Sequence, residues 1–86
     1  MSFTPPPQVP EEFRVLSMMH NIGAISPERS LSAEELAQWR GMDVATVKTY
    51  LQRLREGGYV EFLQMAGAEK YIVTRIGIMK VLTLYS

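Results

Sequence analysis

One stretch, residues 41–60, constrains the fold more than any other part of the chain. It contains Asp43, a good helix cap because its carboxylate accepts hydrogen bonds from the free amides of a first turn. Gly57 and Gly58 supply the stop, since glycine enters the left-handed conformation without a clash of a Cβ atom. The stretch therefore predicts a helix over residues 43–56, followed by the start of a strand.

The two faces of this predicted helix differ in chemistry. At about 100° per residue, Val47, Leu51 and Leu54 share one apolar face. The opposite face is small, hydroxylated, amide-bearing and basic, and consists of Ala45, Thr46, Lys48, Thr49, Gln52 and Arg53. Small residues let a helix sit deep in the major groove of DNA, where hydroxyl, amide and basic side chains bind base edges or phosphates. A core helix whose outer face contacts only water is the alternative interpretation of the same pattern.

Composition argues against several classes of function. The 86-residue chain suits one domain with one modest core, has no cysteine and has a single histidine, His20. We therefore expect no disulfide, no metal site, no cofactor and no identifiable small-molecule ligand, and we expect His20 to pack within the first helix. Catalysis needs a nucleophile beside a base, paired carboxylates or a metal, and none of these is evident, so we do not expect an enzyme.

Neither a membrane span nor a secretion signal is evident. No run approaches the roughly 20 apolar residues that a spanning helix needs, and no basic region precedes an apolar segment at the start. The sequence therefore predicts no membrane partner and a cytoplasmic location.

Charge is balanced overall but unevenly distributed. The chain has nine basic and nine acidic residues, whereas nucleic-acid binding usually leaves a basic excess. Residues 1–39 carry two basic and five acidic residues, and residues 40–86 carry seven basic and four acidic ones. The helix at 43–56 lies in the basic half, so one face of the domain can still turn toward DNA.

The segments before the central stretch have simple signatures. Prolines at 5, 6, 7 and 10 predict an extended arm over residues 1–9, ahead of one domain at 10–86. A helix follows from residue 10 or 11 to about 21, with apolar residues around more than half of its circumference. Residues 30–31 suit a very short strand. Ser32 and Glu35 form a capping box for a helix at 33–40, in which we expect Leu36, Ala37 and Trp39 to face inward, with Met42 as an apolar plug after it.

The segments after the central stretch predict a hairpin and a last helix. Residues 59–64 and 70–73 read as strands around a glycine-containing turn at 65–69. Thr74 can cap a helix at 75–84, which is apolar nearly all round and too short to cross a membrane. Its second apolar face therefore needs a protein partner.

This order of helix, short strand, helix, helix, hairpin and helix is that of a winged helix-turn-helix, an α+β fold. The chain resembles the small winged-helix transcription regulators of the MarR, ArsR and PadR families over roughly residues 11–84. The resemblance rests on Leu36-Ala37, Gly41-Met42-Asp43, Thr46-Val47, Leu51-Gln52-Arg53-Leu54, Gly58-Tyr59-Val60 and Tyr71-Ile72-Val73-Thr74 followed by Gly77.

The resemblance implies a DNA-binding transcription regulator. Double-stranded DNA would be the partner, with the helix at 43–56 in the major groove and the hairpin at 59–73 as a wing on the backbone. Lys70 in the wing would then join the six residues of the outer helix face. The chain departs from the pattern in an acidic residue near the wing tip and in the apolar Ile76 and Ile78 around Gly77.

The apolar surplus of the first and last helices predicts a homodimer on a pseudo-palindromic site. The expected interface is Phe13, Val15, Met18, Met19, Ile22, Ile76, Ile78, Val81, Leu82 and Tyr85. An alternative function is a winged-helix protein-interaction module in a larger complex, without DNA binding. Neutral charge, the proline-rich arm and the two apolar helices also fit that alternative.

Overall fold

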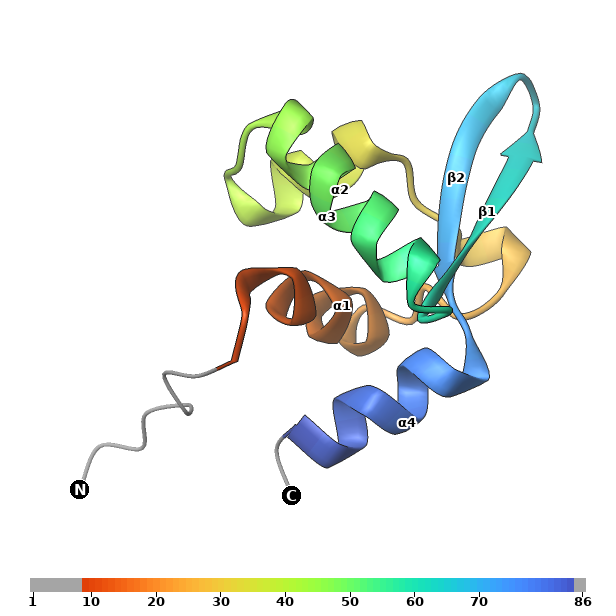
Figure 1. The fold of residues 1–86 in the computed structure, drawn as a ribbon. Helices are drawn as coiled ribbons and strands as arrows, with labels where there is room; N and C mark the ends of the chain where they lie inside the picture. The colour runs from red at the N-terminus through yellow and green to blue at the C-terminus, as the bar shows by residue number, and fades with distance from the viewer. Residues whose placement is uncertain (1–8, 85–86) are drawn as a thin grey trace.

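A computed structural model describes residues 9–84, and its element order confirms the winged helix-turn-helix expected from the sequence (Figure 1). The elements are α1 (Glu11–Asn21), a 3₁₀ helix (Pro27–Arg29), α2 (Ala33–Arg40), α3 (Val44–Glu56), β1 (Val60–Met65), β2 (Ala68–Val73) and α4 (Arg75–Leu84). Residues 1–8 of the expected arm, and Tyr85 of the expected interface, lie outside the described residues.

Helix α1 lies at the centre of the domain. It packs against α2, α3, α4 and β2, and Val15, Leu16 and Met19 have no exposed surface. Because the chain's own elements cover α1 on several sides, its wide apolar face needs no partner chain. This corrects the expectation that Val15 and Met19 belong to a dimer interface.

Local capping explains where α2 and α3 begin and end. Ser32 Oγ accepts from the Glu35 amide at 3.1 Å, and the Ser32 amide donates to Glu35 Oε1 at 2.9 Å, which confirms the predicted capping box. Gly41, at φ 64°, ends α2 in the left-handed conformation. Asp43 Oδ2 then accepts from the Thr46 amide at 3.3 Å and starts α3. The half-buried Met42 packs against the core between the two helices, as predicted.

The prediction that Trp39 faces inward is wrong. Leu36 and Ala37 are buried, whereas the Trp39 side chain is 62% exposed. Trp39 lies two residues after Ala37, which is about 200° further around the helix. Its side chain is therefore directed away from the face on which Ala37 is buried.

The wing is a tight hairpin that projects from the body beside α3 (Figure 1). Its strands pair from Val60 with Val73 to Met65 with Ala68. Only Ala66 and Gly67 form the turn, at φ 51° and 78°, so the predicted turn at 65–69 was too long. Two positive φ angles in a two-residue loop are the mark of a type I′ turn, whose twist matches the strands.

An isolated β-bridge joins Leu31 to the second strand of the wing. The Leu31 amide donates to the Tyr71 carbonyl at 3.1 Å, and the Tyr71 amide donates to the Leu31 carbonyl at 2.8 Å. Only Leu31 forms this bridge, so the short strand predicted at residues 30–31 is reduced to a single bridging residue.

A glycine allows helix α4 to pack closely against the start of the wing. Gly77 is buried, and a Cβ atom there would overlap the Tyr59 carbonyl oxygen. Thr74 caps the helix as predicted, because its Oγ1 accepts from the Gly77 amide at 3.0 Å. In the described part of the chain, no helix has both the length and the apolar character to cross a membrane.

Candidate nucleic-acid interface

The two faces of α3 are separated as the sequence predicts. Val47, Leu51 and Leu54 are fully buried, whereas Lys48 and Thr49 are exposed. Ala45, Gln52 and Arg53 are exposed too, and Thr46 is half-buried. The outer face of α3 therefore contributes little to the core and is available to a ligand.

The polar side chains of this outer face retain hydrogen-bonding capacity. Thr49 Oγ1 donates to the Ala45 carbonyl at 3.1 Å, which leaves the hydroxyl oxygen as an acceptor. Within residues 9–84, the Gln52 side chain forms no hydrogen bond or ion pair, so its amide offers both donors and an acceptor.

Four basic side chains in and around this face are each paired with a glutamate, an arrangement that the sequence analysis missed. Lys48 Nζ lies 4.0 Å from Glu34, Arg53 lies 3.5 Å from Glu12 and Lys70 Nζ lies 3.0 Å from Glu35. Arg40 pairs with Glu11. These pairs join α1 and α2 to α3 and the wing, so no short sequence motif reveals them.

The exposed pairs are weak and open to competition. The side chains of Lys48 and Arg53 are 59% and 57% exposed. Exposed ion pairs contribute about 0–1 kcal/mol, because water and salt screen them. A phosphate group can therefore replace Glu34, whose side chain is 67% exposed, at small cost, whereas the Glu12 side chain that faces Arg53 is only 21% exposed.

Lys70 has a different setting, because it is turned toward α2. Its side chain is 26% exposed, and its ammonium group donates to Glu35 Oε1 at 3.0 Å. The hydrogen bond from the Ser32 amide lowers the pKa of Glu35, and Lys70 lowers it further. Glu35 thus links the start of α2 to the wing. The Lys70 ammonium group, which was predicted to contact DNA, is bound to Glu35 of the same chain.

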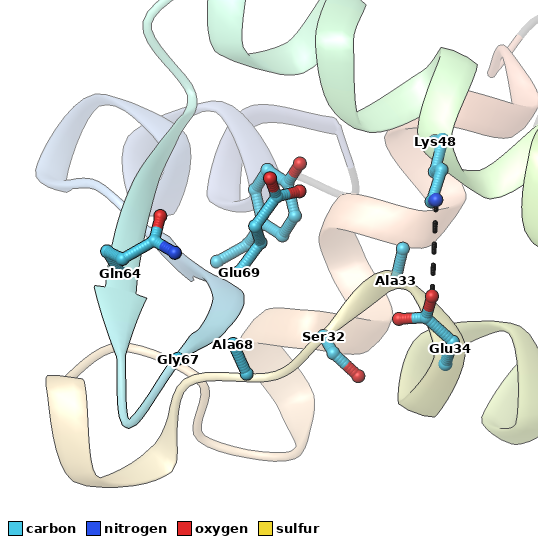
Figure 2. Close-up of a pocket in the computed structure, with 9 residues that line it drawn as sticks. Ser32, Ala33, Glu34, Lys48, Gln64, Gly67, Ala68 and Glu69 are labelled. Carbon is cyan, nitrogen blue, oxygen red and sulfur yellow. Dashed lines mark ion pairs between the residues drawn. The ribbon is translucent and has the colours of Figure 1, made fainter.

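A polar hollow of about 390 Å³ lies between the start of α2, α3 and the wing. Its lining residues are Ser32, Ala33, Glu34, Lys48, Gln64, Gly67, Ala68, Glu69 and Tyr71. Figure 2 shows the Lys48–Glu34 pair on one side and Gln64 and Glu69 of the wing on the other. Burial, reinforced by the Glu69 carboxylate, raises the pKa of the Tyr71 phenol.

One cation–π contact joins the wing to α3, and a ring pair lies within the wing beside it. The Phe62 and Tyr71 rings meet edge to face with centroids 5.6 Å apart, and the Arg55 guanidinium lies 4.9 Å from the Phe62 centroid. Arg55 is thereby directed toward the wing, and the hairpin is fixed beside α3.

Within residues 9–84, no group of three or more histidine, cysteine, aspartate or glutamate side chains is placed to hold a metal ion. His20 is half-buried at the end of α1, and its Nδ1 atom is buried with no hydrogen-bond partner in the described part. This placement agrees with a packed histidine.

The expected dimer residues divide into three groups. Val81, like Val15 and Met19, lies in the chain's own core, so it is unavailable to a partner. Half-buried positions are Phe13, Met18, Ile22 and Ile78. Ile76 and Leu82 are 58% and 60% exposed, and between them lies Met79 at 61%, which the predicted interface omitted. Its spacing of three residues from each neighbour was the available signal.

No family model and no curated protein matches the sequence. Solved structures do match. A MarR family protein from Bacillus stearothermophilus superposes with a TM-score of 0.74 at 16% identity, over 92% of this chain and 52% of that one. The transcriptional regulator Tm0710 from Thermotoga maritima gives 0.65 at 25% identity, over 90% of this chain and 53% of that one.

A shorter neighbour matches over nearly its whole length. The DNA-binding TubR fragment from Clostridium botulinum gives a TM-score of 0.73 at 18% identity, over 96% of this chain and 98% of the fragment. This chain thus spans about half the length of the MarR family protein and of Tm0710, and nearly the whole of the TubR fragment. The protein has the winged-helix fold that these regulators share.

Proposed function

We propose that this protein is a DNA-binding transcription regulator that inserts α3 into the major groove and lays its wing along the backbone. One observation carries this proposal. The exposed face of α3 consists of small, hydroxyl, amide and basic side chains, and it lies beside a projecting hairpin. The structural likeness to a DNA-binding fragment and to a transcriptional regulator supports this assignment.

Each side chain of the α3 face has a role set by its chemistry. Gln52, with its free amide, suits bidentate recognition of an adenine edge. Lys48 and Arg53 suit phosphates, and Ala45 allows close approach of the helix to the duplex. Thr46 and Thr49 offer hydroxyl groups to bases or phosphates. Lys70 acts mainly by holding the wing against Glu35.

The paired charges imply modest affinity for a single copy. Each phosphate contact of Lys48 or Arg53 must displace a glutamate from the same side chain. We infer that two copies act together as a homodimer on a pseudo-palindromic site. The exposed apolar residues of α4 supply the contact surface, and the two α3 helices would then lie about 34–36 Å apart in successive major grooves.

DNA binding is tested by fluorescence anisotropy across a salt series, with a random pool and selected sequences. Arg53→Ala should weaken binding to every sequence and reduce the salt slope by about one. Arg75→Ala, which removes an exposed arginine from α4, is the matched control and should change neither quantity. A wild-type protein that binds no DNA at low salt would favour the protein-interaction module instead.

A second variant tests the ion pairs directly. Glu34→Gln removes the carboxylate that faces Lys48 and lines the hollow beside the wing, so it should strengthen binding to all sequences. Glu28→Gln alters an exposed glutamate of the 3₁₀ helix and serves as the control. Unchanged affinity in Glu34→Gln would show that DNA does not approach Lys48.

A further inference from the structure

The polar hollow beside the wing has a chemistry that the proposed function does not use. Its volume of about 390 Å³ is at the low end of the range of about 300–1,000 Å³ that ligand sites in proteins occupy. The start of α2 and Lys48 of α3 line one side of the hollow, and Gln64, Glu69 and Tyr71 line it from the wing. None of these three wing residues is among the proposed DNA contacts.

The pleat of the wing places Gln64, Glu69 and Tyr71 on one face. Gln64 pairs with Glu69 across the two strands, and Tyr71 follows Glu69 by two residues. Cross-strand partners share a face, as do alternate residues of one strand. Lys70 lies between Glu69 and Tyr71 in the sequence, so it is on the opposite face, where it binds Glu35. The nearest basic residue in the sequence is thus turned away from the Glu69 carboxylate.

The three wing side chains have unused hydrogen-bonding capacity. Within residues 9–84, the Glu69 carboxylate, the Gln64 amide and the Tyr71 hydroxyl form no hydrogen bond, and Glu69 forms no ion pair. The carboxylate offers two acceptor oxygens, and the amide and the phenol offer one each. One side of the hollow therefore presents several acceptors and a negative charge to solvent.

The charges around the hollow also favour a cation. Its described lining residues include two acids, Glu34 and Glu69, and one base, Lys48, which gives a net charge of −1. Lys48 Nζ lies 4.0 Å from Glu34, so the charge of Glu69 is the one left without a partner (Figure 2). Burial raises the pKa of the Tyr71 phenol, and the Glu69 and Glu34 carboxylates raise it further. Both carboxylates thus act on the same part of the hollow.

We propose that this hollow binds a small organic cation with a planar guanidinium or amidinium group. Two parallel N–H groups of such a cation match the two oxygens of the Glu69 carboxylate in a bidentate pair. Its remaining N–H groups donate to the Gln64 carbonyl oxygen and the Tyr71 phenol oxygen. A compact ammonium group lacks this planar fork, so the ligand is selected by shape as well as by charge.

Benzamidine, which carries an amidinium group on a flat ring, is the probe, and benzamide is its neutral counterpart of similar shape. In an NMR titration of the full-length chain, benzamidine should cause saturable shifts of the amide signals of residues 64–71. Benzamide should bind about tenfold more weakly, because it lacks the charge. Equal binding of the two compounds, or shifts that do not saturate, would overturn the proposal. The titration contains no DNA, so its result is independent of the proposed function.

Two wing variants locate the site. Glu69→Gln keeps the size of the side chain but removes its charge, so it should weaken benzamidine binding about tenfold. Glu61→Gln is the matched control and should bind as the wild type does, because Glu61 is an exposed glutamate on the opposite face of the wing. Equal weakening in both variants would assign the binding to the overall charge of the chain and refute the site.

Thermal unfolding verifies that these variants fold. If Glu69→Gln does not fold, Gln64→Ala decides, since it removes one acceptor from an exposed position of the same face. It should weaken benzamidine binding by a smaller factor than Glu69→Gln is expected to. Unchanged affinity in Gln64→Ala would then count against the proposed contacts.

Discussion

The first and last helices have a similar apolar excess in the sequence but opposite environments in the fold. Helix α1 is enclosed by α2, α3, β2 and α4, with Leu16 fully buried. Helix α4 buries only Gly77 and Val81, and leaves Ile76, Met79 and Leu82 more than half exposed. An apolar surplus therefore does not by itself indicate a partner; it does so only where the chain's own elements leave it uncovered.

The largest effect should come from the enclosed helix. Leu16→Ala creates a cavity in the centre of α1 and should lower the free energy of unfolding by about 2–5 kcal/mol, measured by urea denaturation. Ile76→Ala on α4 is the contrasting change and should cost far less in dilute solution, because its side chain is 58% exposed. Equal losses of unfolding free energy in the two variants would contradict the difference between the enclosed α1 and the exposed side of α4.

The contact that seats α4 should show the next largest effect. Gly77→Ala places a Cβ atom against the Tyr59 carbonyl, so α4 must move away from the start of the wing. We expect a loss of about 1–3 kcal/mol in thermal or urea unfolding, as for other overpacked sites. A neutral result would mean that α4 is loosely attached to the domain.

A smaller effect is expected where α4 meets α1 at the surface. Lys80 Nζ lies 4.9 Å from the centroid of the Phe13 ring, whose edge contact with Tyr59 fixes its orientation. Lys80→Gln removes the charge and should cost about 0.5–1 kcal/mol of unfolding free energy. Arg75→Gln, at an exposed position on the same helix, should cost less.

The smallest effect on folding is expected at the exposed side of α4. Leu82→Glu should change the unfolding free energy of the monomer by no more than about 0.5 kcal/mol. Sedimentation at micromolar concentration should nevertheless show a monomer for this variant and, if the proposed homodimer forms, a dimer for the wild type. Asn21→Glu, at the exposed end of α1, should leave the assembly unchanged. A monomeric wild type would remove the dimer from the proposed function.

The elements predicted well are those determined by neighbouring residues. The helix caps join residues only three positions apart, namely Ser32 with Glu35 and Asp43 with Thr46. The starts of α2 and α3 are therefore determined by the local sequence. The apolar spacing of Val47, Leu51 and Leu54 likewise identifies the buried face of α3. Exposure of Ala45, Lys48, Thr49, Gln52 and Arg53 follows from that spacing alone, whereas Thr46 is half-buried and Lys70 lies in the wing.

The features that were not predicted depend on contacts between distant segments or on unusual residue choices. The Glu12–Arg53 and Glu35–Lys70 pairs join segments far apart in sequence, so a count of charges gives no hint of them. The tight wing turn escaped because Ala66 adopts a positive φ that asparagine or glycine usually supplies. The enclosure of α1 depends on packing by four other elements, which periodicity within one helix cannot show.

The two-residue turn at Ala66 and Gly67 also restricts how the length of the wing can change over evolution. Side chains alternate between the faces of a strand, so one inserted residue would reverse every side chain beyond it. Such a reversal would separate the Phe62 and Tyr71 rings and remove the contact between Arg55 and the Phe62 ring. Insertions that keep the turn must therefore add one residue to each strand, and the reach of the wing grows in whole cross-strand pairs.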